Sequence, residues 1–187
     1  MKKIIIADST LSRENANFTF KEKIEIARQL SNLQVDIVEF PEFENVKTDT
    51  LLIKTVSSFI KNSVISVAGG KTVESVTATC EALCNTAKPR IRIELPMSPV
   101  GMEYTCHIKA PKMLELAGEL VSCAASKCDD VEFCMVDATR AEKDFLNEVI
   151  KKVVDNGAKT VTICDDAAEI MPDKFAQFVE EIKSVAG

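Results

Sequence analysis

The chain has 187 residues, of which 46% are hydrophobic and 28% charged, and a formal net charge of -6. This acidic balance, with Lys and Arg dispersed, argues against a nucleic-acid-binding surface. No run reaches the roughly 18 apolar residues that span a bilayer, and the N-terminus reaches Asp8 too early for a signal peptide. We therefore expect a cytoplasmic protein whose residues 1–187 form a single domain.

Cysteine and histidine are distributed in a way that disfavours a zinc site. The seven cysteines lie at positions 80, 84, 106, 123, 128, 134 and 164, without a CxxC pair, and His107 is the single histidine. Zinc sites need tighter clustering and usually more imidazole. We interpret the cysteines as small apolar core residues in a reducing compartment, although Cys80 and Cys84 share a helix face. His107 is interpreted as a surface or structural histidine in a loop.

The first half of the chain alternates short apolar runs with amphipathic segments. Residues 3–7 form a β-branched run typical of a buried parallel strand. Thr19 and Glu22 have the spacing of a capping box and predict a helix start. The following units predict strands at 35–40, 63–68 and 90–95, and helices at 49–61 and 73–86.

The second half continues the alternation after a loop rich in proline. We predict a helix that carries Met113, Leu114, Ala117 and Leu120 on one face. A strand from Asp130 then leads to Asp137 and Arg140. Thr139 and Glu142 predict a second capping box, and Gly157 is expected to end the helix that follows. A strand at 160–164, the pair Asp165-Asp166 and a helix near Pro172 complete the pattern.

Six βα units in a row predict an α/β fold with a parallel sheet. Their strands start roughly 27 to 40 residues apart, the length of one supersecondary unit. Periodicity leaves open whether the sheet is doubly wound or curled toward a barrel. A (β/α)₈ barrel needs two more units and typically about 250 residues. A barrel without strands 7 and 8 would have two open edges, which invite self-association or a completing partner.

Polar residues gather where the predicted strands end, the place where ligands bind in parallel α/β folds. Asp8, Asp137, Arg140 and Asp165 occupy such positions. In the fourth strand, the apolar residues Ile91, Ile93 and Leu95 alternate with Arg90, Arg92 and Glu94. Glu132 and Thr162 extend this polar face, which is either a polar ligand cavity or an internal ion-pair network.

These segments resemble the family of isopropylmalate synthase, homocitrate synthase and hydroxymethylglutaryl-CoA lyase. The likeness runs through nearly all of the chain. It is carried by Asp8-Ser9-Thr10-Leu11, Lys21 to Leu30, Val35 to Glu39, Met102-Glu103-Tyr104, Asp130 to Phe133, Asp137-Ala138 with Arg140, Gly157-Ala158 to Asp165, and Pro172. The resemblance implies a partial TIM barrel of six βα units that lacks strands 7 and 8.

The resemblance also implies a reaction, the metal-dependent condensation of acetyl-CoA with a 2-oxo acid. Family members carry an Asp-Thr-Thr-Leu-Arg-Asp type motif after the first strand, in which Arg polarises the oxo acid and Asp binds a divalent metal. Here the segment is Asp8-Ser-Thr-Leu-Ser-Arg-Glu-Asn15. Aligned without a gap, Ser12 replaces the Arg and Arg13 the Asp. With one inserted residue, Arg13 and Glu14 take those roles.

Several positions depart from the family pattern and indicate loss of the reaction. The third strand ends in Gly69-Gly70 instead of an Arg, and Ser98-Pro-Val-Gly101 replaces a Ser-Asp followed by a His. Val136 stands where an acidic residue is expected. Asp165-Asp-Ala-Ala168 places a carboxylate where the family offers a hydroxyl, which would repel an anionic substrate. The family's paired metal histidines belong to a strand beyond this chain.

Three hypotheses follow from the resemblance. The chain is a catalytically impaired family member, an active enzyme completed by a partner or a second copy, or a non-catalytic protein that binds small carboxylates. For the enzyme we assign catalytic roles to Arg13, Glu14, Asp137 and Arg140. Substrate-binding roles go to Asp8, Arg92, Glu94, Ser98 and Asp165. No metal ligand is assigned, and a divalent metal and acetyl-CoA are expected only where the family activity survives; nucleic-acid and membrane partners are not expected.

Overall fold

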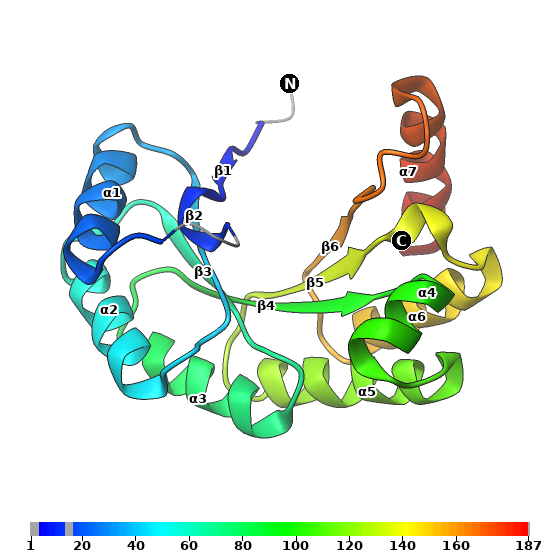
Figure 1. The fold of residues 1–187 in the computed structure, drawn as a ribbon, viewed down its shortest axis with the longest axis horizontal. Helices are drawn as coiled ribbons and strands as arrows, with labels where there is room; N and C mark the ends of the chain where they lie inside the picture. Colours follow the sequence, from blue (N-terminus) through cyan, green and yellow to red (C-terminus); the bar gives the residue numbers. More distant parts are fainter. Residues whose placement is uncertain (1–3, 14–16, 187) are drawn as a thin grey trace. The chain divides into compact units, whose positions relative to one another are not determined.

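The structure is a computed structural model that describes residues 4–13 and 17–186 (Figure 1). Its six strands lie in one sheet in the order β1-β2-β3-β4-β5-β6, and the registered strand pairs are parallel. The predicted α/β class is therefore confirmed. A doubly wound sheet reverses its strand order at a switch point, whereas a TIM barrel keeps sequential order. The observed order is that of six consecutive TIM-barrel units.

The secondary structure alternates as the sequence predicts. The strands are β1 (Ala7–Asp8), β2 (Ile37–Phe40), β3 (Val64–Ala68), β4 (Pro89–Pro96), β5 (Val131–Val136) and β6 (Thr160–Ile163). The helices are α1 (Phe20–Asn32), α2 (Val46–Phe59), α3 (Val73–Leu83), α4 (Pro99–Gly101), α5 (Ala110–Ala125), α6 (Lys143–Asp155) and α7 (Pro172–Ala186). Three short turns are η1 (Thr10–Ser12), η2 (Met102–Cys106) and η3 (Ala138–Arg140). In the part of the chain that is described, no helix has the length and apolarity needed to cross a membrane.

The first of two compact units contains the described residues up to Arg92, together with Lys127–Asp129. Within it, α1 packs against α2 and α2 against α3, and the three helices lie along one side of β2 and β3 (Figure 1). The core is formed by apolar side chains such as Val38, Val56 and Ile65, all fully buried. The predicted capping box at the start of α1 is confirmed, since the Thr19 hydroxyl accepts from the Glu22 amide and the Glu22 carboxylate accepts from the Thr19 amide.

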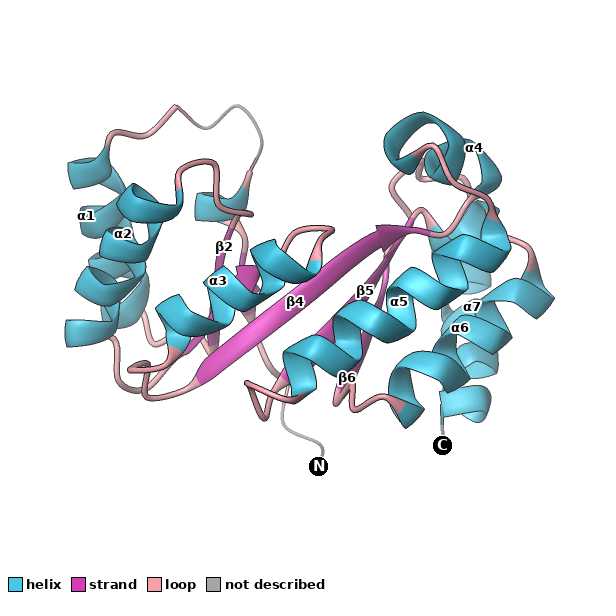
Figure 2. Cartoon of the chain, turned by 90° about the horizontal axis from the view of Figure 1, so that it is seen from below, coloured by secondary structure: helices cyan, strands magenta, loops and turns pink. Residues whose placement is uncertain are grey.

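The second unit contains Ile93–Ser126 and the residues from Asp130 onward. Helix α5 packs against α6 and α6 against α7, so that the three follow one another beside β5 and β6 (Figure 2). Met113, Phe133 and Val149 are fully buried in this unit. Strand β4 contributes residues to both units. The single domain expected over residues 1–187 stays a prediction.

The predicted burial of the first strand is wrong. Lys3 lies outside the described residues, and Ile4, Ile5 and Ile6 are 84%, 62% and 60% exposed. Only Ala7–Asp8 enters the sheet, where it pairs with β2. β1 is the first strand in the order, so its backbone has a partner strand on one side alone within the described sheet. The isoleucines precede this two-residue strand, and an apolar sequence there does not ensure an apolar environment.

The predicted capping box of Thr139 and Glu142 is also wrong. Glu142 is itself the N-cap residue of α6, without a side-chain cap, and Thr139 belongs to the turn η3. The turn is inserted between β5 and α6, which shifts the helix start by three residues. At the other end of α6, Gly157 has a φ of +108°. This conformation suits glycine just beyond a helix end and confirms its predicted role.

Candidate functional site

Asp137 and Arg140 form a bidentate ion pair at the end of β5. Asp137 is 5% exposed and has the left-handed backbone conformation, with φ 57° and ψ 38°. The turn η3 then brings Arg140 back toward it. Arg140 Nε donates to Asp137 Oδ1 at 2.8 Å, and Nη2 donates to Oδ2 at 2.5 Å. Two parallel bonds of this kind fix the orientation of both groups.

Ser98 completes the coordination of the Asp137 carboxylate from the loop after β4. Its side chain is buried, and its hydroxyl donates to Asp137 Oδ2. The Ser98 hydroxyl oxygen also accepts from the Gly101 amide at 3.1 Å and so caps the short helix α4. The ends of β4 and β5 lie together here, since the Met97 amide donates to the Val136 carbonyl at 2.9 Å. Three of the predicted site residues therefore meet at one point.

The loop after β6 is bound to the loop after β5 by two carboxylates. The Thr139 hydroxyl donates to Asp165 Oδ1 at 2.6 Å, and the Asp137 amide donates to Asp166 Oδ2 at 2.6 Å. Asp165 also accepts from the amides of Glu169 and Ile170. We refer to the set below as the strand-end cluster. It consists of Ser98, Asp137, Thr139, Arg140, Asp165 and Asp166.

The hydrogen bonds of the cluster stabilise the ionised forms of Asp137 and Asp165. The hydrogen bonds from Arg140 lower the pKa of Asp137, and this effect outweighs burial, which raises it. The hydrogen bond from Ser98 also lowers the pKa of Asp137. The Thr139 hydroxyl lowers the pKa of Asp165. Asp137 in turn raises the pKa of Arg140. Asp137 and Asp165 are therefore weak bases at neutral pH, and Arg140 already has an anionic partner.

The remaining predicted site residues belong to other segments of the chain. Asp8 and Arg13 belong to the first unit, where Asp8 Oδ1 accepts from the Thr10 amide at 3.0 Å and Arg13 is exposed. Glu14 lies outside the described residues. Glu94 is on the part of β4 in the second unit and is partly exposed.

Arg92 belongs to a buried polar network of the first unit. It is 5% exposed, and its Nη1 donates to Ser66 Oγ at 3.1 Å and lies 3.8 Å from Glu39 Oε2. The polar face of β4 was expected to be either a ligand cavity or an internal ion-pair network. For Arg92, in the part of β4 that belongs to the first unit, the contacts are those of an internal ion-pair network.

The described residues do not fit the divalent metal that the family chemistry implies. Among residues 4–13 and 17–186, no group of three or more His, Cys, Asp and Glu side chains is arranged to hold a metal ion. One oxygen of Asp8 already accepts a backbone amide, and Ser12 and Arg13 offer no carboxylate. A hard cation needs several oxygen ligands at one point.

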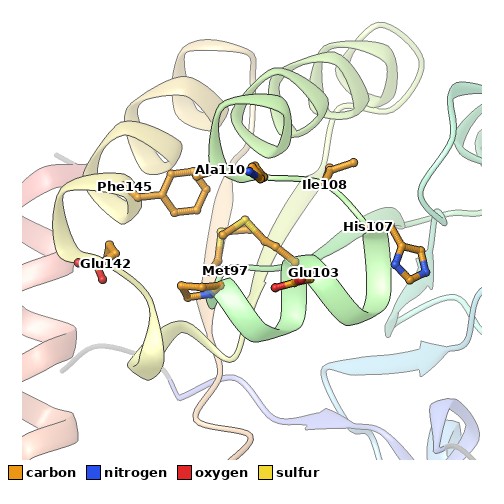
Figure 3. A pocket seen from close by; sticks show the side chains of 10 residues that line it. Met97, Glu103, His107, Ile108, Ala110, Glu142 and Phe145 are labelled. Atoms are coloured by element: carbon orange, nitrogen blue, oxygen red, sulfur yellow. The ribbon is translucent and has the colours of Figure 1, made fainter.

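A pocket of about 630 Å³ opens in the second unit between the loop after β4 and the start of α6 (Figure 3). Phe145 points into it from α6, and His107 lies at its far end. The residues that line it are Met97, Pro99, Met102, Glu103, His107, Ile108, Lys109, Ala110, Glu142 and Phe145. No residue of the strand-end cluster is among them, although Met97 adjoins Ser98 in the chain. The mostly apolar lining suits a ligand with an apolar part.

The sequence interpretation missed some side chains that the fold brings together. Residue patterns alone do not assign Thr139 and Asp166 to the site, although each makes a hydrogen bond between the loops after β5 and β6. Cys134 and Cys164, which the sequence analysis interprets as small apolar core residues, have their sulfur atoms 3.3 Å apart. The sequence does carry one indication of the contact between the two cysteines. Side chains alternate between the two faces of a strand, so that Glu132 and Cys134 lie on one face of β5.

Comparison with known proteins gives relatives that are longer than this chain. The chain is 30% identical to 2-isopropylmalate synthase 1 of Caldanaerobacter subterraneus subsp. tengcongensis, over 98% of this chain and 47% of the relative. It is 33% identical to 2-isopropylmalate synthase of Clostridium kluyveri, over 97% of this chain and 36% of the relative. The chain thus spans about a third to a half of the length of these relatives.

Solved structures of HMG-CoA lyases share the fold. The enzyme from Brucella melitensis superposes with a TM-score of 0.81 at 13% identity, over 100% of this chain and 69% of that chain. The enzyme from Pseudomonas aeruginosa gives a TM-score of 0.76 at 12% identity, over 96% and 63%. The profile of the HMGL-like family matches residues 3–186. The chain therefore belongs to the HMGL-like family.

Proposed function

We propose that this chain, as an isolated polypeptide, is a catalytically impaired member of the HMGL-like family in which the strand-end cluster is structural. The supporting observation is the bidentate pair of Asp137 and Arg140. If Arg140 had the catalytic role that the sequence assigns to it, it would have to present its guanidinium to the substrate. Arg140 would first have to leave Asp137, and that would leave a buried carboxylate with Ser98 as its remaining side-chain donor.

The loops after β1 and β6 support the same proposal. Asp8 binds the amide of Thr10, and the residue that follows η1 is the exposed Arg13. After β6, Asp166 accepts from the Asp137 amide and adds negative charge near the position of an anionic substrate in the family. A 2-oxo acid would be repelled by this carboxylate.

The release of free CoA tests this proposal. The purified chain is incubated with acetyl-CoA and pyruvate, as a simple 2-oxo acid, in the presence of Mg²⁺, Mn²⁺ or Zn²⁺ in turn. We expect no CoA release above that of the protein-free control. Metal-dependent release that is lost in Arg140→Met and kept in Lys143→Met would overturn the proposal. Lys143 is a matched control, because it is an exposed cation that follows η3 and pairs with Glu181 on the surface.

A second candidate function is an active enzyme completed by a partner or a second copy. It is supported by the greater length of the relatives and by the exposed isoleucines before β1. Exposed apolar residues beside an open strand edge favour association. On this proposal CoA release appears only at concentrations where the chain associates, which light scattering measures in the same samples. Associated protein without any CoA release would exclude completion by a second copy of the chain.

A further inference from the structure

The side chains of β5 and β6 meet along a repeated diagonal in the second unit. The strands are parallel, with Glu132 opposite Thr160 and Cys134 opposite Thr162. Glu132 nevertheless accepts from the hydroxyl of Thr162, two residues further along β6. Cys134 repeats this offset with Cys164, and the two sulfur atoms are 3.3 Å apart. The packing of the two strands therefore holds both thiols in contact, although 30 residues separate them.

The two thiols differ in exposure. Cys134 is 6% exposed within β5, whereas Cys164 is only partly buried where β6 ends. The hydrogen bond with Cys134 lowers the pKa of Cys164. Burial and the carboxylates of Asp166, Glu94 and Glu132 act in the opposite direction but are weaker. A thiol that is accessible and more acidic than usual is the one expected to react first.

We propose that Cys134 and Cys164 are a redox-active dithiol that a peroxide converts to a disulfide, with Cys164 as the attacking thiol and Cys134 as the resolving thiol. A disulfide needs the two sulfurs to close from contact to roughly 2 Å. The inference rests on the packing of β5 against β6. It is independent of whether the chain catalyses the family reaction.

The reaction balances with hydrogen peroxide as the two-electron oxidant. The Cys164 thiolate attacks one peroxide oxygen, an S–O bond forms, and the O–O bond breaks to release hydroxide, which takes the thiol proton as water. Cys164 is then a sulfenic acid. The sulfur of Cys134 attacks that of Cys164, the S–S bond forms, and the S–O bond breaks to release a second water. Two thiols lose two electrons and two protons, and the peroxide is reduced to two waters.

The disulfide would lie directly beside the strand-end cluster. The carbonyl of Cys164 accepts from the Ala138 amide at 3.0 Å, and Cys164 is followed by Asp165 and Asp166. A covalent bond at Cys164 would fasten the loop after β6 to β5. In a reducing compartment the bond is transient and is reversed by thiol exchange.

Mass spectrometry of the oxidised full chain tests the proposal. The reduced protein is treated with hydrogen peroxide, the remaining thiols are alkylated under denaturing conditions, and tryptic peptides are mapped. We expect a mass loss of about 2 Da and a linked peptide pair that contains Cys134 and Cys164. Cys84→Ser, which removes an exposed thiol on another element, is the matched control and should give the same linked pair. Absence of the pair, or its appearance only after unfolding, would overturn the proposal.

Two single variants test which thiol is attacked. In Cys134→Ser the sulfenic acid has no resolving partner, so dimedone should label Cys164 in the folded protein. In Cys164→Ser we expect at least tenfold less labelling at Cys134, because that thiol is buried. Equal labelling of the two variants would overturn the assignment of Cys164 as the attacking thiol. Both variants are checked by circular dichroism before oxidation, and either can be replaced by the corresponding alanine variant if it does not fold.

Discussion

The guanidinium of Arg140 binds both carboxylate oxygens of Asp137, three residues before it in the chain, at 2.8 and 2.5 Å. The contact is made possible by the left-handed backbone of Asp137, which turns the chain directly into η3. Asp and Asn adopt this conformation more readily than other residues with a side chain. Asp137 therefore has two separable roles, one in the backbone and one in the ion pair.

Substitution of Asp137 separates these roles. We expect Asp137→Asn to keep the backbone conformation but to lose the charged pair with Arg140, at a cost of about 1–3 kcal/mol in the free energy of unfolding. The cost is moderated because the Arg140 side chain is 43% exposed and can turn to water. Asp137→Ala should cost more, since alanine also disfavours a positive φ. Urea denaturation measures both.

Lys143→Gln is the control for Asp137→Asn, because it removes an ion pair between side chains that are 67% and 55% exposed. Exposed pairs contribute between zero and about 1 kcal/mol. If Asp137→Asn costs no more than Lys143→Gln, the pair of Asp137 and Arg140 does not organise the end of β5.

The lowered pKa of Asp137 predicts how this contribution depends on pH. An unfolded aspartate titrates near 3.9, and the folded group titrates below that value. At acidic pH the unfolded state therefore binds more protons, so the stabilisation is complete above the unfolded pKa and is lost as the pH falls through the folded one. The stability difference between the native protein and Asp137→Asn should be largest near pH 7 and shrink below pH 4. A difference that stays constant from pH 7 to pH 3 would contradict the prediction.

The sequence predicted the alternation of strands and helices and placed Asp137, Arg140 and Asp165 where strands end, because both are properties of short segments. It could not predict which partner each polar group would take. Thr139 and Glu142 have capping-box spacing, but the Thr139 hydroxyl binds Asp165, 26 residues away. The sulfurs of Cys134 and Cys164 meet across 30 residues. Such contacts depend on the register of neighbouring strands, which no local pattern encodes.

Two glycines of the second unit provide a matched test of backbone strain and packing. Gly157 has a φ of +108°, and an added Cβ would lie 2.8 Å from the Cβ of Ala125. We expect Gly157→Ala to destabilise the protein by about 1–3 kcal/mol, since both the backbone and the packing oppose it. Thermal denaturation followed by circular dichroism measures the effect.

Gly118→Ala is the comparison, because Gly118 lies inside α5 and its added Cβ would meet the side chain of Lys152. The nearest atom is Lys152 Cε, part of a flexible side chain that can move aside. Alanine also favours the helix over glycine by up to about 1 kcal/mol. We therefore expect little loss or a small gain in stability. A loss as large as that of Gly157→Ala would show that Lys152 cannot move.

The exposed residues Ile4 and Ile6 predict association of the isolated chain. They are 84% and 60% exposed and precede the edge strand β1. Exposed apolar residues beside a strand edge favour contact with a second chain, whereas lysine at an edge opposes it. The double variant Ile4→Lys with Ile6→Lys should therefore show a lower average mass in light scattering than the native chain at equal concentration.

Leu33→Lys is the control for this double variant. Leu33 is a single apolar residue at the end of α1, 74% exposed, and its replacement should leave the mass unchanged. Equal masses for the native chain and the double variant over a tenfold range of concentration would show that this edge does not mediate association, and the second candidate function would lose its structural support.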